Sequence, residues 1–498
     1  MVVTNKTRSA EIRARLKHPV IDADGHTVEF MPPLEDYVKA AGGSDYEVRL
    51  TPSFGRGQPE ADEARKDVRA PRPPWWGVPA KNTLDRATAA LPKLLHERMD
   101  EFGLDYTVLF GTTLGVDVRR KGSMNPFDAE AAQVRARAVN TYRAEICREF
   151  ADRMTPVATV PMHTPGIAIE ELEHAVKNLG LKTIAISAVL RPIPSVMREF
   201  PDLYKLKVGF STLGCWLDTF GIDSDYDYDP FWAKCAELKV PVMTHGQGMG
   251  FTTRNSATNY MYNHIGHFAS AGEAMAKALF MGGVTRRFPT LRFAFLEGGA
   301  ATGCRLYADL VGHWQKRNAR DLENYNPNNL DRELFLDLHQ RYGGKMVEGR
   351  MDRVLTGGQN LEPEHFADTA FLDDFARCEI RRPEDIRDLF IPRFFFGCEA
   401  DDPTNAIAFN PKLWPMGARI NAMFSSDIGH WDVPDMTKVL EEAYELVEEG
   451  NMTPEDFRDF TLANPVRFFA GVNPDFFKGT VVEASVERLI SEHPSALE

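Results

Sequence analysis

Residues 19–26 read PVIDADGH, and this stretch decides the fold class of the chain. A short apolar run, interrupted by one acid, leads directly into Asp24, Gly25 and His26. Apolar runs without strict alternation are typical of parallel strands that are buried on both faces. Side chains two residues apart in a strand lie on the same side, so we expect Asp24 and His26 to face the same space.

Seven further runs of this kind follow along the chain. Segments with helical periodicity separate most of them, which indicates repeated β-α-β units and a parallel sheet. The eight predicted strands are 19–24, 105–111, 155–161, 183–187, 241–245, 291–297, 393–398 and 422–426. Eight such units favour a closed (β/α)8 TIM barrel, an α/β fold that forms one domain over residues 1–498.

Three insertions add length beyond the barrel. Residues 41–85 are rich in glycine, proline and charge, residues 188–228 are rich in aromatic side chains, and residues 323–390 are polar and predicted to be helical. Long loops on a barrel are typical of lids or partner contacts, and they are compatible with a homodimer. Trp75 and Trp76, in the first insertion, either close over a substrate or pack the insertion onto the barrel.

Composition excludes several classes of protein. The net charge of -14 argues against a nucleic-acid partner, which requires a basic face. The first residues are charged and lack the apolar core of a signal peptide, and no run approaches the roughly 20 apolar residues of a membrane span. Six cysteines without a C-x-x-C spacing indicate reduced thiols, so we expect a cytoplasmic protein without a membrane partner.

Histidine or carboxylate side chains follow five of the eight predicted strands. Each such group alone is more typical of a hydrogen-bonded structural residue, but burying so many without partners costs several kcal/mol each, on the order of 2–7 for neutral groups. A shared cation removes that cost, and imidazole with carboxylate suits Zn, Mn or Fe. The residues are Asp24, His26, His245, Glu297, Glu399, Asp427 and His430. Because barrel active sites lie at the carboxyl ends of the strands, the pattern predicts a metal site there.

Several motifs of the chain resemble those of one enzyme family. They are VIDADGHTVE, RMDEFGLDYTVLF, DPFWAKCAELKVPVMTHG, GGVTRRFPTLRFAFLEGG, MFSSDIGHWD and LANPVRFFAG. In combination they resemble the amidohydrolase-related branch of the amidohydrolase superfamily, which includes aminocarboxymuconate-semialdehyde decarboxylase. The resemblance implies a TIM barrel with a divalent metal held by Asp24, His26, His245 and Asp427.

Two positions depart from the pattern of that family. The first strand carries Asp-x-His rather than His-x-His, which makes Mn or Fe as suitable as Zn. The decarboxylases carry a histidine at the end of the sixth strand, where this chain has Glu297. We expect His264 or His267 to replace the missing imidazole as a ligand or acid/base; the alternative is that both only cap the following helix. No lysine follows the fourth strand, so a bridging carboxylated lysine is not indicated.

The resemblance implies a metal-dependent hydrolase or non-oxidative C–C lyase, decarboxylase-like, that acts on a carbonyl-bearing organic acid or its derivative. Asp427 is the expected ligand that also accepts a proton, and Glu297 or His267 the expected general acid/base. His430, three residues after Asp427, is expected to contact the small-molecule substrate or a second metal.

Two other interpretations remain open at this point. The ligand candidates exceed what one cation needs, and some similar barrels are dinuclear non-heme iron monooxygenases whose organic-acid substrates are often carried as coenzyme A thioesters. One or two metal ions are therefore compatible with the sequence. A non-catalytic barrel that retains a structural metal and acts through its insertions is the third interpretation.

Overall fold

The computed structural model describes residues 6–50, 59–67, 69–74, 79–112, 116–123, 125, 127–201, 214–246, 255–357 and 372–492. Its centre is a parallel sheet in the order β1-β3-β5, continued by β6-β7-β10-β11-β12-β13. The strands are β1 (Ile21–Thr27), β3 (Tyr106–Gly111), β5 (Met154–Pro156), β6 (Ala158–Thr159), β7 (Ile184–Ile186), β10 (Val242–Thr244), β11 (Phe293–Phe295), β12 (Phe394–Glu399) and β13 (Asn421–Ser425). Because β5 and β6 form one interrupted strand, all eight predicted strands are confirmed.

The last strand returns to the first and closes the barrel. The Asp427 amide donates to the Asp24 carbonyl at 2.8 Å, and the His26 amide donates to the Ile428 carbonyl at 2.7 Å. The Asp22 carboxylate adds side-chain links, since it accepts hydrogen bonds from Thr107 on β3 and from Ser426 after β13. The predicted (β/α)8 barrel is therefore the fold of this chain.

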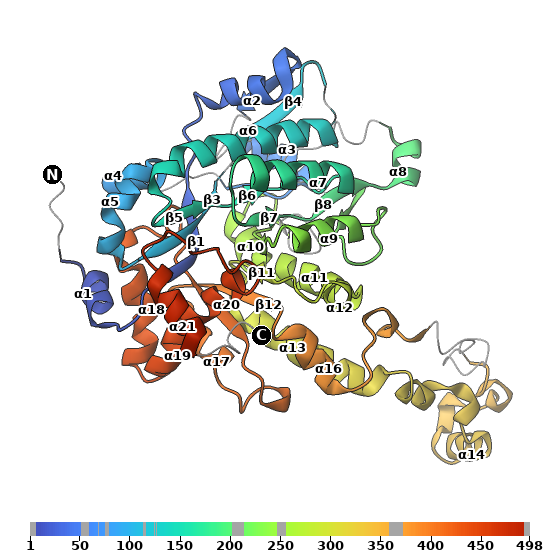
Figure 1. The fold of residues 1–498 in the computed structure, drawn as a ribbon. Helices are drawn as coiled ribbons and strands as arrows, with labels where there is room; N and C mark the ends of the chain where they lie inside the picture. The colour runs from blue at the N-terminus through green and yellow to red at the C-terminus, as the bar shows by residue number, and fades with distance from the viewer. Residues whose placement is uncertain are drawn as a thin grey trace.

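Helices surround the strands and cover the outer face of the barrel (Figure 1). Those that lie between successive barrel strands include α5 (Pro92–Phe102), α6 (Ala129–Cys147), α7 (Pro165–Glu173), α9 (Asp229–Glu237), α11 (His267–Met281), α12 (Val284–Arg287), α13 (Gly299–Arg317), α16 (Pro383–Phe390) and α17 (Asn405–Ala408). Two more helices, α2 (Leu34–Gly42) and α4 (Thr83–Ala90), also lie between β1 and β3. The first strand is preceded by α1 (Arg8–Arg15), and the last is followed by α18 (Val439–Glu448), α19 (Pro454–Arg458), α20 (Asn464–Ala470) and α21 (Glu483–Glu492).

One end of the barrel interior is filled with apolar side chains. Inward-facing residues such as Ile21, Tyr106 and Phe395 form one buried cluster with Phe468 and Phe469 of α20. These strand residues lie toward the amino ends of their strands, so the C-terminal helices close that end of the barrel. The polar groups are thereby left at the opposite, carboxyl end, where barrel enzymes bind substrate.

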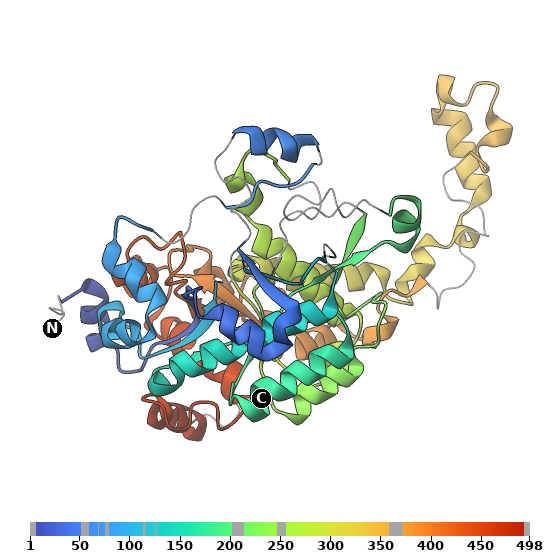
Figure 2. The ribbon, with the colours of Figure 1, turned by 90° about the horizontal axis from the view of Figure 1, so that it is seen from above.

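The insertions build on top of this barrel. In the first insertion, β2 (Tyr46–Leu50) pairs antiparallel with β4 (Val116–Arg120). In the second, β8 (Val189–Pro192) pairs antiparallel with β9 (Cys215–Asp218), beside the short helix α8 (Pro194–Glu199). In the third, α14 (Arg332–Tyr342) lies near the tip of an arm that projects from the barrel in both views (Figures 1 and 2). This helix agrees with the helical structure predicted for that insertion.

The Trp75-Trp76 pair lies outside the described residues. Two further helices of the insertions and loops, α3 (Pro59–Asp67) and α10 (Tyr260–His264), are described. Within the described part of the chain, no helix is long and apolar enough to cross a membrane.

Candidate metal centre

Three strand ends bring together a first group of possible ligands. Asp24 and His26 come from β1, and His245 follows β10. Their ligand atoms lie within 4.8 Å of one another. The Nε2 atoms of His26 and His245 are 3.2 Å apart, and His26 Nε2 is 2.9 Å from Asp427 Oδ1. The structure thus brings together the four residues that the family resemblance implies.

Simple alternation does not account for the position of the β1 residues. Ile21 and Ala23 pack in the apolar interior, and the β1–β3 register shifts between Asp22 and Gly25. A bulge of this kind re-aims the side chains that follow it. We infer that this irregularity, rather than an even strand, directs Asp24 and His26 into the site.

A second group lies beside the first. It contains Glu297 after β11 and Asp427, His430 and Asp432 after β13, again with ligand atoms within 4.8 Å of one another. His430 Nδ1 is 3.0 Å from Asp427 Oδ2 and 3.1 Å from Asp432 Oδ1. Both groups combine imidazole nitrogen with carboxylate oxygen, the donor set that suits Zn, Mn and Fe.

The buried oxygens of these residues fit a cation. Both carboxylate oxygens of Asp24 and of Glu297, and Oδ1 of Asp427, are buried without a hydrogen-bond donor among the described residues. Buried polar groups in native proteins almost always have a partner. Two ligands bound at about 2.1 Å to one ion lie roughly 3.0–3.4 Å apart, and the 3.2 Å between the His26 and His245 nitrogens falls in that range. The site therefore has the donors, the spacing and the missing partners of a metal centre.

Burial is the main cause of the pKa shifts at the site. Burial raises the pKa of Asp24 and of Glu297 well above the usual values, and the neighbouring Asp427 raises both further. Burial likewise raises the pKa of Asp427 to about 8, although His430 lowers it. Burial lowers the pKa of His26 and His245 well below the usual range. A cation favours the deprotonated form of every one of these groups, so its binding would replace protons.

Two of the carboxylates lie on strained backbone. Glu297 and Asp427 both have φ of 52°, in the left-handed region that side-chain-bearing residues rarely adopt. Each lies two residues after the last residue of its strand. Such conformations cost on the order of 1–3 kcal/mol each and cluster at functional sites, so the strain supports a functional role for this pair.

His264 and His267, the two histidines expected to replace the missing imidazole of the sixth strand, lie near both ligand groups but belong to neither. His264, the last residue of α10, has its ring centroid 5.2 Å from that of Trp431 and 4.9 Å from that of His267. The His267 ring packs on Phe268, which in turn contacts His245. His264 and His267 therefore line the space beside the site, and their assignment as ligands or acid/base stays a prediction.

Sequence reasoning missed two residues of the site. Asp432 completes the second group, and Asp22 anchors β1 to β3 and to the segment after β13. The signal for Asp432 was present in the motif SSDIGHWD, where it lies two residues after His430.

Glu399, at the end of β12, is mostly buried; burial and then Asp427 raise its pKa to about 8. This places Glu399 near the ligands, as a neighbour of both Asp427 and Asp432.

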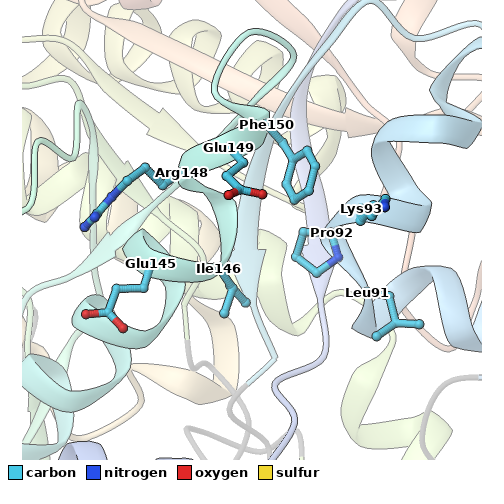
Figure 3. A pocket seen from close by; sticks show the side chains of 8 residues that line it. All are labelled: Leu91, Pro92, Lys93, Glu145, Ile146, Arg148, Glu149 and Phe150. Carbon is cyan, nitrogen blue, oxygen red and sulfur yellow. The ribbon is translucent and has the colours of Figure 1, made fainter.

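A surface pocket elsewhere on the barrel does not contribute to this site. It lies between the start of α5 and the end of α6 (Figure 3). Its lining residues are Leu91, Pro92, Lys93, Glu145, Ile146, Arg148, Glu149 and Phe150. None of them belongs to either ligand group.

The fold and the ligand groups define a (β/α)8 barrel with a candidate metal site at the carboxyl ends of its strands. A sequence profile described as amidohydrolase matches residues 21–326, and the chain belongs to the amidohydrolase family. This match confirms the resemblance found in the sequence at the level of the family.

Solved structures with a similar fold include an amidohydrolase from Mycobacterium avium subsp. paratuberculosis K-10, at 16% identity and a TM-score of 0.48, which covers 91% of this chain and 100% of that one. A 5-carboxyvanillate decarboxylase from Sphingomonas paucimobilis has 13% identity and a TM-score of 0.47, with 91% and 98% covered. A dihydroxybenzoic acid decarboxylase from Polaromonas sp. JS666, with bound manganese and the inhibitor 2-nitroresorcinol, has 15% identity and a TM-score of 0.46, with 91% and 97% covered.

Proposed function

We propose that this protein is a metal-dependent hydrolase or decarboxylase-like C–C lyase that acts on a small carbonyl-bearing organic acid or its derivative. The observation that carries the proposal is the convergence of Asp24, His26, His245 and Asp427 at the carboxyl end of an amidohydrolase-family barrel. Their oxygens and nitrogens are as far apart as atoms that bind one metal ion. Several of these buried atoms have no hydrogen-bond partner among the described residues.

The ligand set fits a divalent cation, which would lower the pKa of a bound water and polarise a substrate carbonyl or carboxylate. Asp24, His26 and His245 would hold it, with Asp427 as the fourth ligand. In hydrolysis, Asp427 would also accept the proton that the attacking water releases, since its carboxylate lies between His26 and His430. Glu297 and His267 are the candidates that return this proton to the product.

Metal removal tests this proposal. Chelated, metal-free protein should lose turnover on a panel of aromatic and aliphatic carboxylic acids and their amides, and Zn, Mn or Fe(II) should restore it. Metal-free protein that remains fully active would contradict the proposal. Release of carbon dioxide distinguishes a decarboxylase from a hydrolase.

A second candidate function is a dinuclear non-heme iron monooxygenase, whose substrate could be an organic acid bound as a coenzyme A thioester. The observation that favours it is the number of carboxylates around the site, which exceeds the needs of one cation. Oxygen consumption by Fe(II)-loaded protein with a reductant and such an acid would support this function. Turnover without oxygen would exclude it.

A further inference from the structure

The arm that carries α14 exposes a row of apolar side chains. Leu334, Leu338 and Tyr342 follow one another at a spacing of i, i+4 along α14, which places them on one side of the helix. They are 52%, 41% and 79% exposed, and Met346, four residues further on in η7 (Gly344–Met346), is 77% exposed. Single exposed apolar residues are ordinary on a protein surface, but a contiguous group of them is typical of an interaction site.

The helix α14 has little to pack against in the described part of its own chain. It is 11 residues long, and none of these residues is buried. The elements that it contacts most, η7 and η8 (Met351–Arg353), belong to the same arm, which projects away from the barrel (Figures 1 and 2). A helix of this length is only marginally stable in water unless its apolar face packs against another element. The exposed row therefore indicates that α14 packs against a second polypeptide.

A row of charged side chains runs beside the apolar row, and the signs of its charges are ordered. The acids Glu333 and Asp337 come first, and the bases Arg341 and Lys345 follow, again at a spacing of four residues. Within one chain, Arg341 Nη2 lies 2.8 Å from Asp337 Oδ2, and the two side chains are 64% and 42% exposed. An exposed ion pair of this kind contributes little to stability. It can therefore be exchanged for a pair across an interface at little cost.

We propose that α14 pairs antiparallel with α14 of a second copy of this chain. A two-fold axis perpendicular to the helices places each charged row opposite its own copy with the direction reversed, as in a self-complementary dimer interface. The acids of one copy then face the bases of the other, and the two apolar rows meet beside them. Parallel pairing would instead place acids opposite acids and bases opposite bases.

The charge of the whole chain also favours contact through the arm. The net charge is -14, so two copies repel each other on average. Residues 332–346, in contrast, carry three lysine or arginine side chains and two aspartate or glutamate side chains. Charges separated by more than about 10 Å are largely screened at ordinary ionic strength, and copies that meet at their arms keep their acidic barrels apart. This inference goes beyond the proposed function and does not depend on a bound metal.

The molar mass of the full-length protein in solution tests this proposal. Sedimentation velocity at micromolar concentrations should show a dimer for the wild type. Leu334→Ser should raise the dimer dissociation constant about tenfold or more, because each dimer loses the apolar contact twice. The matched control is Leu413→Ser, which removes a leucine outside the arm that is 55% exposed, close to the 52% of Leu334. This control should associate like the wild type.

Charge reversals test the antiparallel orientation. Glu333→Lys/Asp337→Lys makes the charged row entirely basic, and Arg341→Glu/Lys345→Glu makes it entirely acidic. Each double variant should have half the molar mass of the wild type, because like charges then face each other. An equimolar mixture of the two double variants should regain the wild-type mass, since a basic row then meets an acidic row. The variant that combines all four reversals should regain it as well, because its row is again self-complementary.

Three results would overturn the proposal. The first is a wild-type chain that sediments as a monomer. The second is a wild-type molar mass for Leu334→Ser and for both double variants, because the copies would then meet at another surface. The third is a pair of double variants that dissociate but do not associate when mixed, although circular dichroism shows that both are folded.

Discussion

Asp427 shows how much the proposed function depends on single residues. Its backbone is strained, its carboxylate is buried, and its two oxygens contact different histidines. None of these features improves the stability of the isolated chain. A buried charge without a compensating partner is destabilising, so we expect the metal-free site to trade stability for affinity toward a cation.

Asp24→Asn tests that trade. The substitution keeps the shape of the side chain and removes a buried carboxyl group that would carry a negative charge beside Asp427 when a cation is bound. We expect metal affinity to fall about 100-fold or more, with loss of turnover, while the metal-free variant melts at the same or a higher temperature than the metal-free wild type. Elemental analysis and calorimetry of both proteins give the answer. A metal-free variant that is less stable and still binds metal tightly would contradict this expectation.

His163 allows a test of stability against pH away from the ligands. Burial, followed by the charges of Arg191 and Arg135, lowers its pKa to about 4, against the opposite effect of Asp128. Because the unfolded histidine titrates near about 6.5, the unfolded chain takes up the proton first. The contribution of His163 to stability is therefore full above about pH 6.5 and is lost as the pH falls toward 4, by about 2 kcal/mol between pH 7 and pH 5.

Denaturant unfolding of wild type and His163→Gln across this range measures that contribution. The difference between the two free energies of unfolding should change with pH in the direction given above. Parallel curves for the two proteins would show that His163 does not titrate in this way.

At the scale of elements, the segment around α3 is attached to the loop that leads into α10. The Arg72 amide donates to the Ser256 carbonyl at 2.8 Å, and the buried Arg65 donates through Nε to the Ala257 carbonyl at 3.1 Å. The fully buried Asn263 joins both pieces, since its Nδ2 donates to the carbonyls of Arg72 and Ser256. Because α10 ends in His264 beside Trp431, this attachment positions one wall of the site.

Asn263→Ala should release that attachment. It leaves backbone groups without partners, at a local cost of about 1–3 kcal/mol, so amide hydrogen exchange should speed up both in 59–74 and in 255–264. The barrel strands should keep their protection. Asn259→Ala is the matched control. Asn259 caps α10 by accepting from the Tyr262 amide, so exchange should rise in α10 and not in 59–74. Equal effects of both variants on 59–74 would refute the role of Asn263.

At the scale of the whole molecule, one buried carboxylate helps to close the barrel. Asp22 accepts from the Ser426 amide at 2.8 Å, from the Ser426 hydroxyl at 2.7 Å and from the Thr107 hydroxyl at 2.6 Å. The two bonds from Ser426 connect residues 404 positions apart in the sequence. Closure of the first strand against the last therefore depends partly on side-chain acceptors and not only on the backbone ladder.

Asp22→Ala should weaken this closure. Removing the acceptor leaves four buried donors, since the Asp24 amide also donates to Asp22 Oδ1 at 3.2 Å. We expect a cost of about 3 kcal/mol of unfolding free energy. Asp22→Asn keeps one carbonyl acceptor and should cost less than half as much. Both variants are measured without metal, so that effects on the neighbouring ligands do not enter. Equal stability of the two variants would argue against the proposed closure.

The eight strands and the barrel could be predicted because each depends on local pattern, and so could the convergence of the candidate ligands Asp24, His26, His245 and Asp427. An apolar run followed by an acid or a histidine identifies both a strand and its carboxyl end, and the barrel brings those ends together. His264 and His267 were harder to place, because their position depends on where a loop packs. Asp432 does not directly follow a predicted strand, so no strand end marks it as a candidate. Its distance from Glu297 depends on two segments that are far apart in the chain.

The sequence by itself determined the order of strands, the family and the residues that end at the active face. Only the tertiary structure decided that Glu297 and Asp427 direct their oxygens to different nitrogens, and that Asp22 links the first strand to the last. The physical reason is that strand formation and ligand type are set by neighbours in the chain. Ligand geometry is set by distances across the closed barrel, between residues that local patterns do not relate.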